Sequence, residues 1–305
     1  MIRYLASHIA KGSYRGDPDL RDARFVHVNG WTDVSVCDSL IYSHRKTDYS
    51  TVDFDETAHF HDYYELVIYR SGNVDYVDGD RVLSPTPPSV IRFAPGEIHN
   101  TRLRASCPYE RHVFYFRPSL FSLEGNSYPV APFLFRTDAP HAFSIPPEHR
   151  EEVEAILGEL DALADAESPN RLLCLCVTLR LFALLDRLAD KRDESESARA
   201  LPERLRRIRT YIDTRYAEVD SITDLSEHFF YSREYVARLF RKYYNVTVSE
   251  YLTGVRIRRS VEKLESGASV TETAYAVGFK SASAFSLAFR KVMGISPSDY
   301  AKRKK

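Results

Sequence analysis

Cysteine is scarce in this chain, with four in 305 residues. Cys174 and Cys176 lie two positions apart in an apolar helical run, so they face different sides and cannot form a pair of metal ligands. Cys37 and Cys107 are isolated in the sequence. This distribution indicates reduced thiols within the core of a cytosolic protein.

Long hydrophobic runs are absent as well. Residues 1–20 contain no sustained apolar stretch, which argues against a secretory signal. The most apolar segment, residues 171–189, is interrupted by Arg180 and Asp186 and falls short of a membrane span. We therefore expect a buried or interfacial helix there and no membrane partner.

A large net charge is absent overall, but the two ends of the chain differ. The formal net charge is -1. Residues 202–305 carry 20 Lys and Arg against 12 Asp and Glu, whereas residues 1–201 carry 22 against 31. A basic end on an acidic chain suggests that the C-terminal part meets a polyanion while the rest has another task.

Residues 25–117 are rich in Tyr, Val, Ile, Phe and Thr, in short runs separated by Gly, Pro, Asn and Asp. Two strand-like runs surround Gly72, and the Asp78-Gly79 pair that follows is typical of a tight hairpin. Many short strands with regular turns predict a β-sandwich or a β-barrel.

Near residue 147 the pattern changes from strands to helices. Residues 148–164 and 170–190 carry apolar residues at a spacing of three to four, and Ser168 and Pro169 separate the two predicted helices. The apolar positions are Val153, Ile156, Leu157, Leu160 and Leu163, then Leu172, Leu175, Leu179, Leu184 and Leu188. Residues 190–200 are polar and charge-dense, as linkers are.

The C-terminal third contains an internal repeat. Residues 221–251 align with residues 269–300 at an offset of 48 in the first helix and 49 after the turn. The matched pairs are Phe230 with Phe279, Val236 with Phe285, Phe240 with Phe289, Arg241 and Lys242 with Arg290 and Lys291, Asn245 with Gly294, and Tyr251 with Tyr300. The repeat predicts two related helix-turn-helix units.

Each unit has the residues that its turns require. Ser232 and Ser281 can cap the second helix of each unit at its N-terminus. Gly278, Asn245 and Gly294 suit the left-handed conformation that ends a helix.

The connecting helix, within residues 251–266, would fix the distance between the two recognition helices. We expect Tyr251, Val255, Val261 and Leu264 to face inward, and Arg256, Arg258, Arg259 and Lys263 to face largely outward. A separation of roughly 34 Å would let both recognition helices enter one face of the duplex.

These features resemble the AraC/XylS family of bacterial regulators, whose DNA-binding domain consists of two helix-turn-helix units. The matching residues are Leu239, Phe240, Arg241, Lys242, Arg256, Ile257, Ala274, Gly278, Phe279, Phe285, Phe289, Arg290, Lys291, Gly294, Pro297 and Tyr300. Ser226 and Ser260 stand where the family usually has Ala, and Asn245 where it usually has Gly. These small polar changes weaken packing or capping and leave the fold prediction intact.

The resemblance places base-reading residues on the early turns of the two recognition helices. They are Glu234, Ala237 and Arg238 in the first unit and Ala282, Ser283, Ser286 and Leu287 in the second. Arg238 can bond a guanine edge and Glu234 can accept from cytosine, whereas the second unit offers only small or apolar side chains. The expected phosphate contacts are Arg241, Lys242, Lys280, Arg290 and Lys291. We expect the first unit to set most of the sequence preference and the second to supply anchorage.

A second constellation lies in the N-terminal half. His59, His61 and Glu65, followed later by His99, resembles the cupin pattern. His59 and His61 share one face of a strand, and Glu65 can join them after a short bend. Three imidazoles and a carboxylate suit a first-row divalent metal. By resemblance, AraC-type regulators carry such a barrel as their effector pocket, to which we add Tyr64.

Three interpretations of this constellation stay open. The histidines line or brace a ligand pocket, they hold a metal that organises or is the ligand, or they form the centre of a cupin enzyme such as a dioxygenase or isomerase. Further lining candidates, which suggest a small polar ligand, are Trp31, Tyr64, Tyr69, Arg92 and Arg102.

The sequence therefore predicts a multidomain α+β protein. Residues 1–147 form a cupin-like effector-binding barrel, 148–190 a helical segment that by resemblance pairs two subunits, 191–201 a linker, and 202–305 the all-α DNA-binding domain. We expect a cytoplasmic, non-enzymatic transcription regulator whose partners are double-stranded DNA, a small-molecule effector, a second copy of the chain and RNA polymerase. The rivals are a cupin metalloenzyme with a DNA-binding tail and a constitutive DNA-binding protein.

Overall fold

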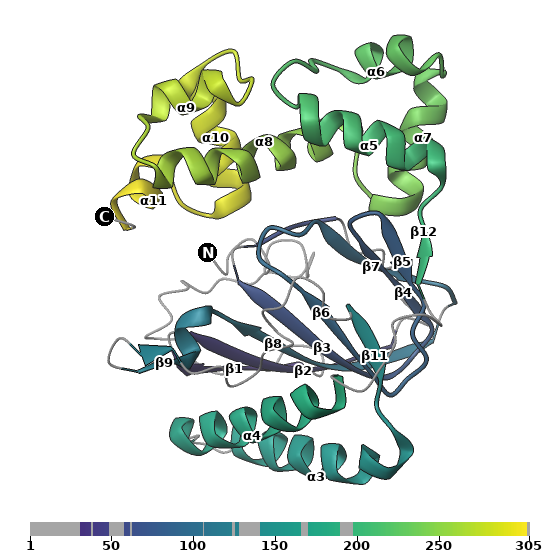
Figure 1. The fold of residues 1–305 in the computed structure, drawn as a ribbon, viewed down its shortest axis with the longest axis vertical. Coiled ribbons are helices and arrows are strands. Elements are labelled where there is room, and N and C mark those ends of the chain that lie inside the picture. Colours follow the sequence, from purple (N-terminus) through teal and green to yellow (C-terminus); the bar gives the residue numbers. More distant parts are fainter. Residues whose placement is uncertain are drawn as a thin grey trace.

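The computed structural model describes residues 31–37, 39–48, 58–61, 63–105, 107–123, 126–127, 141–165, 170–189 and 198–303. The predictions that fall on residues 1–30 and 190–197 lie outside these ranges. The described chain is arranged in layers: two helices, a large sheet, a small sheet and a helical C-terminal half (Figure 1).

The large sheet has six antiparallel strands in the order β1-β2-β8-β3-β6-β11. They are β1 (Trp31–Cys37), β2 (Leu40–Asp48), β8 (Pro108–Phe116), β3 (Tyr64–Ser71), β6 (Ser89–Phe93) and β11 (Ala142–Ser144). The long strands β2, β8 and β3 are rich in β-branched and aromatic residues, which pack well on a pleated surface.

The small sheet has the order β12-β5-β4-β7. Its strands are β12 (Ala198–Ala200), β5 (Arg81–Leu83), β4 (Val74–Asp78) and β7 (His99–Leu103). The predicted hairpin is confirmed, because Asp78 pairs with Arg81 and Gly79 takes the left-handed conformation at φ 56°. Gly72, at φ 139°, turns the chain from the large sheet to the small one.

The two sheets enclose an aromatic core. Val67 and Tyr69 of β3 pack with Tyr76 of β4, Phe93 of β6 and Tyr115 of β8. This confirms the predicted β-barrel-like domain. The short elements η1 (Pro118–Phe121), β9 (Ser122–Leu123) and β10 (Asn126–Ser127) follow β8.

Helices α3 (Pro147–Ala164) and α4 (Arg171–Ala189) cover the outer face of the large sheet (Figure 1). Both lie within one residue of the predicted bounds, and no helix of the described chain is long and apolar enough to cross a bilayer. The predicted stripe of α4 is partly wrong. Leu172 is 68% exposed, whereas Leu181, Phe182 and Leu185 are buried, because the buried face is rotated relative to the predicted one.

The C-terminal half is helical throughout. Its elements are α5 (Glu203–Arg215), α6 (Ile222–Phe229), α7 (Arg233–Tyr244), α8 (Val248–Glu265), α9 (Val270–Ala276), α10 (Ala282–Met293) and α11 (Pro297–Arg303). Ser232 and Ser281 cap α7 and α10 as predicted, and Asn245 and Gly294 end these helices at φ 51° and 75°.

One matched pair of the repeat is wrong. In the first unit the left-handed residue after the first helix is Phe230. In the second unit the same position is held by Gly278, so Phe230 corresponds to Gly278 and not to Phe279. Tyr231 is the counterpart of Phe279, since both donate their N–H to the carbonyl five residues earlier. The extra residue of the second unit is therefore Lys280, between Phe279 and the N-cap Ser281, in the connection from α9 to α10.

The helical half packs on the outer face of the small sheet. Val77 and Val82 belong to the same apolar cluster as Leu205, Ile208 and the rest of the helical core. Part of the predicted linker, residues 191–201, is a strand, because residues 198–200 pair with β5 as β12. The small sheet thus separates the barrel interior from the helical half.

Candidate functional site

The first recognition helix, α7, presents its predicted base-reading face to solvent. Glu234 and Arg238 are exposed and Ala237 is half-buried. The Arg238 guanidinium lies 5.4 Å from the centre of the Tyr235 ring, which orients the side chain without burying it. A guanidinium and a carboxylate one turn apart can both reach a base edge.

The second recognition helix, α10, is less polar. Ser283 and Leu287 are exposed, with Leu287 at 75%, while Ser286 is half-buried. Ala282 packs against the helical core. The geometry leaves Ser283 as the freest polar side chain of this predicted set.

The predicted phosphate-contacting residues Arg241, Lys242, Lys280, Arg290 and Lys291 are all exposed. Arg241 donates to the carbonyl of Asn245, and Lys280 pairs with Asp220 at 3.0 Å. Surface pairs of this kind cost little to break. These cations are therefore accessible to a polyanion.

The arginines of α8 differ from their predicted outward orientation. Arg256 donates to the carbonyls of Tyr216 and Val219, both at 2.8 Å. Arg258 reaches across to the carbonyl of Gly96 in the barrel domain at 3.1 Å. Both side chains hold backbone outside α8, because a guanidinium donates readily to carbonyls outside regular helices and strands.

The four predicted metal-binding side chains converge at one end of the barrel. His59, His61, Glu65 and His99 are buried, and one ligand atom from each lies within 4.8 Å of the others. The Glu65 Oε2 atom is 3.0 Å from His61 Nε2 and 3.2 Å from His99 Nε2. His59 and His99 also exchange backbone hydrogen bonds of 3.0 Å.

The tautomers of two histidines follow from their second nitrogens. The Nδ1 of His61 lies 2.8 Å from the carbonyl of Tyr63, and that of His99 lies 3.0 Å from the carbonyl of Glu97. Each Nδ1 therefore carries a proton, and each Nε2 turns toward Glu65. In a neutral imidazole the Nε2 lone pair would then face the Glu65 carboxylate, and the two would repel. A proton on Nε2 or a bound cation removes this repulsion.

This arrangement fits a divalent metal. Carbonyls that fix the far nitrogen of a ligating histidine are the usual outer support of such sites. Burial alone would raise the pKa of Glu65, but its contacts with His61 and His99 outweigh burial and hold the pKa well below the ordinary value, so the carboxylate is ionised as a metal ligand must be. A metal held here would supply a fixed positive charge and a Lewis acid at the end of the barrel.

Two predicted lining residues lie elsewhere. Tyr64 stacks on Phe116, at 5.5 Å between ring centres, and packs with the core under α3 and α4. Alternation along β3 places it on the opposite face from Glu65. Arg102 faces outward from β7 and stacks over Tyr243 of α7. Neither therefore belongs to the barrel pocket.

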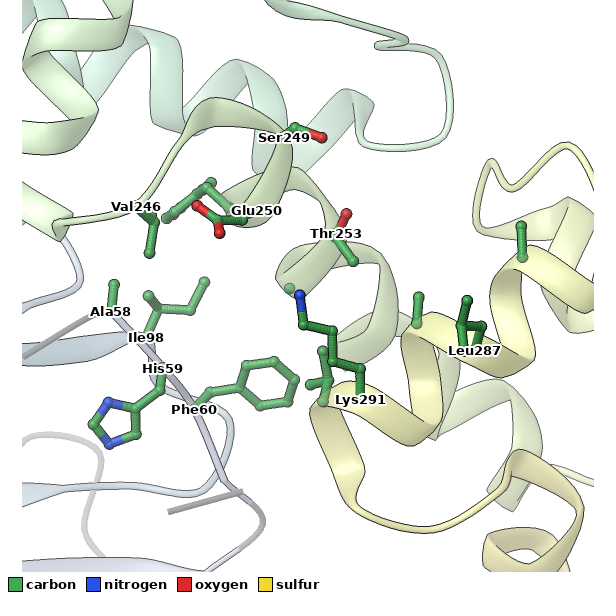
Figure 2. Close-up of a pocket in the computed structure, with 15 residues that line it drawn as sticks. Ala58, His59, Phe60, Ile98, Val246, Ser249, Glu250, Thr253, Leu287 and Lys291 are labelled. Carbon is green, nitrogen blue, oxygen red and sulfur yellow. The ribbon is translucent and has the colours of Figure 1, made fainter. Parts of the chain in front are cut away.

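The histidine cluster is joined to the helical C-terminal half through its own strand segment. The N–H of Ala58, next to His59, donates to the carbonyl of Tyr244 at 2.8 Å, and the Tyr244 hydroxyl donates to the carbonyl of Gly79. The His59 ring joins the cluster, while Phe60 turns the other way, toward α8 and α10 (Figure 2). Neighbouring residues of one extended segment thus serve both domains.

A cavity of about 430 Å³ lies at this junction. Figure 2 shows Phe60 and Ile98 of the barrel domain on one side, with Leu287 and Lys291 of α10 on the other. Two residues that were predicted to face DNA therefore also face the barrel domain.

Sequence reasoning missed the residues that join the domains. Tyr244, Arg258 and Gly96 gave no signal, because each is ordinary within its own element and acts only across the interface. Arg256, which acts within the helical half, carried a signal in the family motif, but its partners Tyr216 and Val219 are not part of that motif.

Comparison with known proteins agrees with this geometry. An AraC-like ligand binding domain matches residues 44–203, and a helix-turn-helix domain matches residues 225–303. The chain belongs to the AraC family.

Curated relatives match parts of the chain. The Msm operon regulatory protein of Streptococcus mutans is 32% identical over 139 residues, which cover 44% of this chain and 49% of that protein. The transcriptional regulatory protein HptR of Staphylococcus aureus is 35% identical over 85 residues, 28% of this chain and 34% of that protein. The chain thus spans about half the length of the first relative and a third of the second.

Among solved structures, ToxT from Vibrio cholerae is 15% identical and covers 87% of this chain and 98% of its own, with a TM-score of 0.36. The C-terminal domain of AraT from Geobacillus stearothermophilus is 28% identical and covers 34% of this chain and 87% of its own, with a TM-score of 0.33. The family assignment rests on the matched domains and not on these superpositions.

Proposed function

We propose that the protein is a transcription regulator that binds DNA through α7 and α10 and is controlled by a small ligand in the barrel. One observation carries the control: Ala58, adjacent to the candidate ligand His59, is hydrogen-bonded to Tyr244 at the C-terminal end of α7. A ligand that moves the His59 segment must therefore move or release the first recognition helix.

The DNA-binding part is tested by the salt dependence of affinity. Genome-wide mapping of bound DNA provides the target sequence. If six or more phosphates are neutralised, affinity for that sequence falls on the order of 10³-fold between 50 and 200 mM salt. A flat response would rule out binding through the basic residues of the C-terminal half.

The control is tested by adding candidate ligands drawn from the substrates of neighbouring genes. We expect at least one to change DNA affinity about tenfold, which corresponds to roughly 1.4 kcal/mol of coupling. A constitutive DNA-binding protein would show no change with any ligand.

A divalent metal is the second candidate, as the ligand itself or as the group that organises it. The Nε2 atoms of His61 and His99 support this candidate, because they lie 3.0 and 3.2 Å from the Glu65 carboxylate. Metal analysis of tag-free protein is expected to give one equivalent, lost in His61→Ala and retained in His44→Ala, whose histidine lies in a different cluster. Reconstituted protein without metal would leave a plain ligand pocket.

The same proposal includes a cytoplasmic, non-enzymatic role. The proposal also includes a homodimer, formed through the exposed Leu172 and Leu173 of α4, and contact with RNA polymerase. Sedimentation of the wild type and of a Leu172→Glu, Leu173→Glu double variant tests the dimer, since two charges on the seam should give monomers. Conversion of a barrel ligand to product would instead support the cupin enzyme.

A further inference from the structure

A second pocket, of about 490 Å³, lies where three parts of the chain meet. Strand β7 of the barrel domain, the strand β12 that leads to the helices, and the last turn of α7 each contribute residues. The pocket lies on the outer face of the small sheet and is separate from the histidine cluster.

Positive charge dominates this pocket. Its charged lining residues are Arg102, Arg104, Arg199, Lys242 and Asp75, a net charge of +3. The single carboxylate is already engaged: Asp75 accepts from Ser84 at 2.6 Å and pairs with Arg199 at 3.0 Å and with Arg104 at 3.4 Å. Asp75 is 4% exposed, whereas the side chains of Arg104 and Arg199 are 40% and 65% exposed, so both arginines stay accessible to a ligand.

The other two cations lack an acidic partner within the described part of the chain. Arg102 and Lys242 lie on the Tyr243 ring, at 5.2 and 5.4 Å from its centre. Two cations on one ring repel each other, and the ring offsets only part of this cost. The N-terminus of α5, directly after Pro202 of the lining, adds positive partial charge.

We propose that this pocket binds a phosphate group and that the bound phosphate fastens the first helix-turn-helix unit to the barrel. Guanidinium forks from two strands match phosphate oxygens bidentately, and Lys242 adds a point charge from the recognition helix. The volume leaves room for a phosphate that is part of a larger molecule. That molecule is either a free phosphorylated compound or the backbone of bound DNA.

Calorimetry on the full chain tests the site, with inorganic pyrophosphate as the probe and sodium chloride matched for ionic strength. We expect one equivalent per chain, and at least about tenfold weaker binding in Arg102→Ala and in Arg199→Ala, as for loss of a charged hydrogen bond. Arg199→Lys keeps the charge but loses the fork and should be intermediate. Arg180→Ala, which removes an exposed arginine of α4 paired with Glu159, should bind as the wild type does.

The DNA arm, which rests on the proposed function, identifies the source of the phosphate. If DNA supplies it, the slope of log affinity against log salt falls by about one in Arg102→Ala. If a free compound supplies it, the slope is unchanged while pyrophosphate binding is lost. Equal pyrophosphate binding by all variants overturns the proposal. So does a wild type that binds no pyrophosphate, if the salt slope of DNA affinity is also unchanged in Arg102→Ala. Wild-type DNA binding is measured in the same series, so failure of the regulator proposal is seen separately.

Discussion

At the scale of single residues, Phe230 stands in a conformation that phenylalanine rarely adopts. It has φ 57° and is 93% exposed, so its side chain gains little from packing. The left-handed conformation costs roughly 1–2 kcal/mol for a residue with a Cβ, and glycine in turn loses about 0.5–1 kcal/mol of unfolded-state entropy. We therefore expect Phe230→Gly to stabilise the fold by about 0.5–1 kcal/mol, measured as a higher urea midpoint at unchanged slope.

The matched position in the second unit provides the control. An alanine Cβ at Gly278 would approach the backbone of Ala217 to 2.8 Å, at φ 89°. Gly278→Ala should therefore lower stability by about 2–3 kcal/mol. A lower midpoint for Phe230→Gly would mean that the exposed ring makes a stabilising contact and that backbone strain is not its main effect.

Arg238 carries the clearest prediction about specificity. Arg238→Ala should weaken binding to the natural site by roughly 1–3 kcal/mol and leave unrelated DNA almost unaffected, because a base edge is read only in the right sequence. Arg241→Ala is the matched comparison and should weaken both equally. Gel-shift titrations on the two DNAs measure the difference, and equal loss for Arg238→Ala would contradict base reading.

At the scale of elements, a buried polar network attaches α3 to the large sheet. The Tyr42 hydroxyl donates to Asp161 of α3 at 2.5 Å and lies 2.7 Å from His112 Nδ1, which therefore donates to it. Burial, and next the charge of His44, lower the pKa of His112 to about 3. The folded protein thus keeps His112 neutral where the unfolded chain would take up a proton.

The sign of the pH effect follows from this difference. The contribution of His112 to stability is complete above its unfolded pKa of about 6.5 and is lost as pH falls toward about 3. For His44, burial lowers the pKa, but the hydrogen bond and charge of Asp161 and the contact with Glu110 raise it overall. The contribution of His44 to folding stability is therefore complete below pH 6.5, and His44 adds no pH dependence of stability in that range.

We expect the wild type to lose about 1.5 kcal/mol more stability than His112→Gln between pH 6.5 and pH 5. Urea unfolding at the two pH values measures this loss. Subtracting the loss in His112→Gln from that in the wild type removes the contribution of groups that titrate elsewhere in the protein. Parallel losses in both would show that His112 is protonated in the folded state.

The structure of these elements follows their sequence closely. The hairpin at Gly79, the caps at Ser232 and Ser281 and the left-handed ends at Asn245 and Gly294 depend on residues a few positions apart, so they could be predicted. Phe230 could not be, because its backbone conformation is imposed by the packing of the unit against its intrinsic preference.

At the scale of the whole molecule, the barrel and the helical C-terminal half share one interface. Tyr244→Phe removes the hydrogen bond to the Gly79 carbonyl and leaves the buried ring in place. A bond of this kind contributes about 1 kcal/mol, so amide exchange in residues 96–99 and 244–258 should become about fivefold faster. Tyr275→Phe, on the exposed side of α9, serves as the control and should change nothing.

The sequence by itself determined the two halves of this protein and the chemistry within each. The helix-turn-helix repeat, the strand-rich barrel and the shared face of His59 and His61 could be predicted, because local spacing dictates which residues share a face. His99, which lies 34 residues beyond Glu65, entered the predicted group only through the resemblance to the cupin pattern. The charge difference between the two halves was readable in the same way.

Only the tertiary structure decided how the halves meet. It turned Arg258 from a predicted surface residue into a clamp on the barrel domain, moved Arg102 out of the barrel pocket, and gathered the basic pocket from three distant segments. The physical reason is that an interface depends on the packing of two finished surfaces. No periodicity or spacing within one segment encodes which carbonyl of another segment will lie within reach.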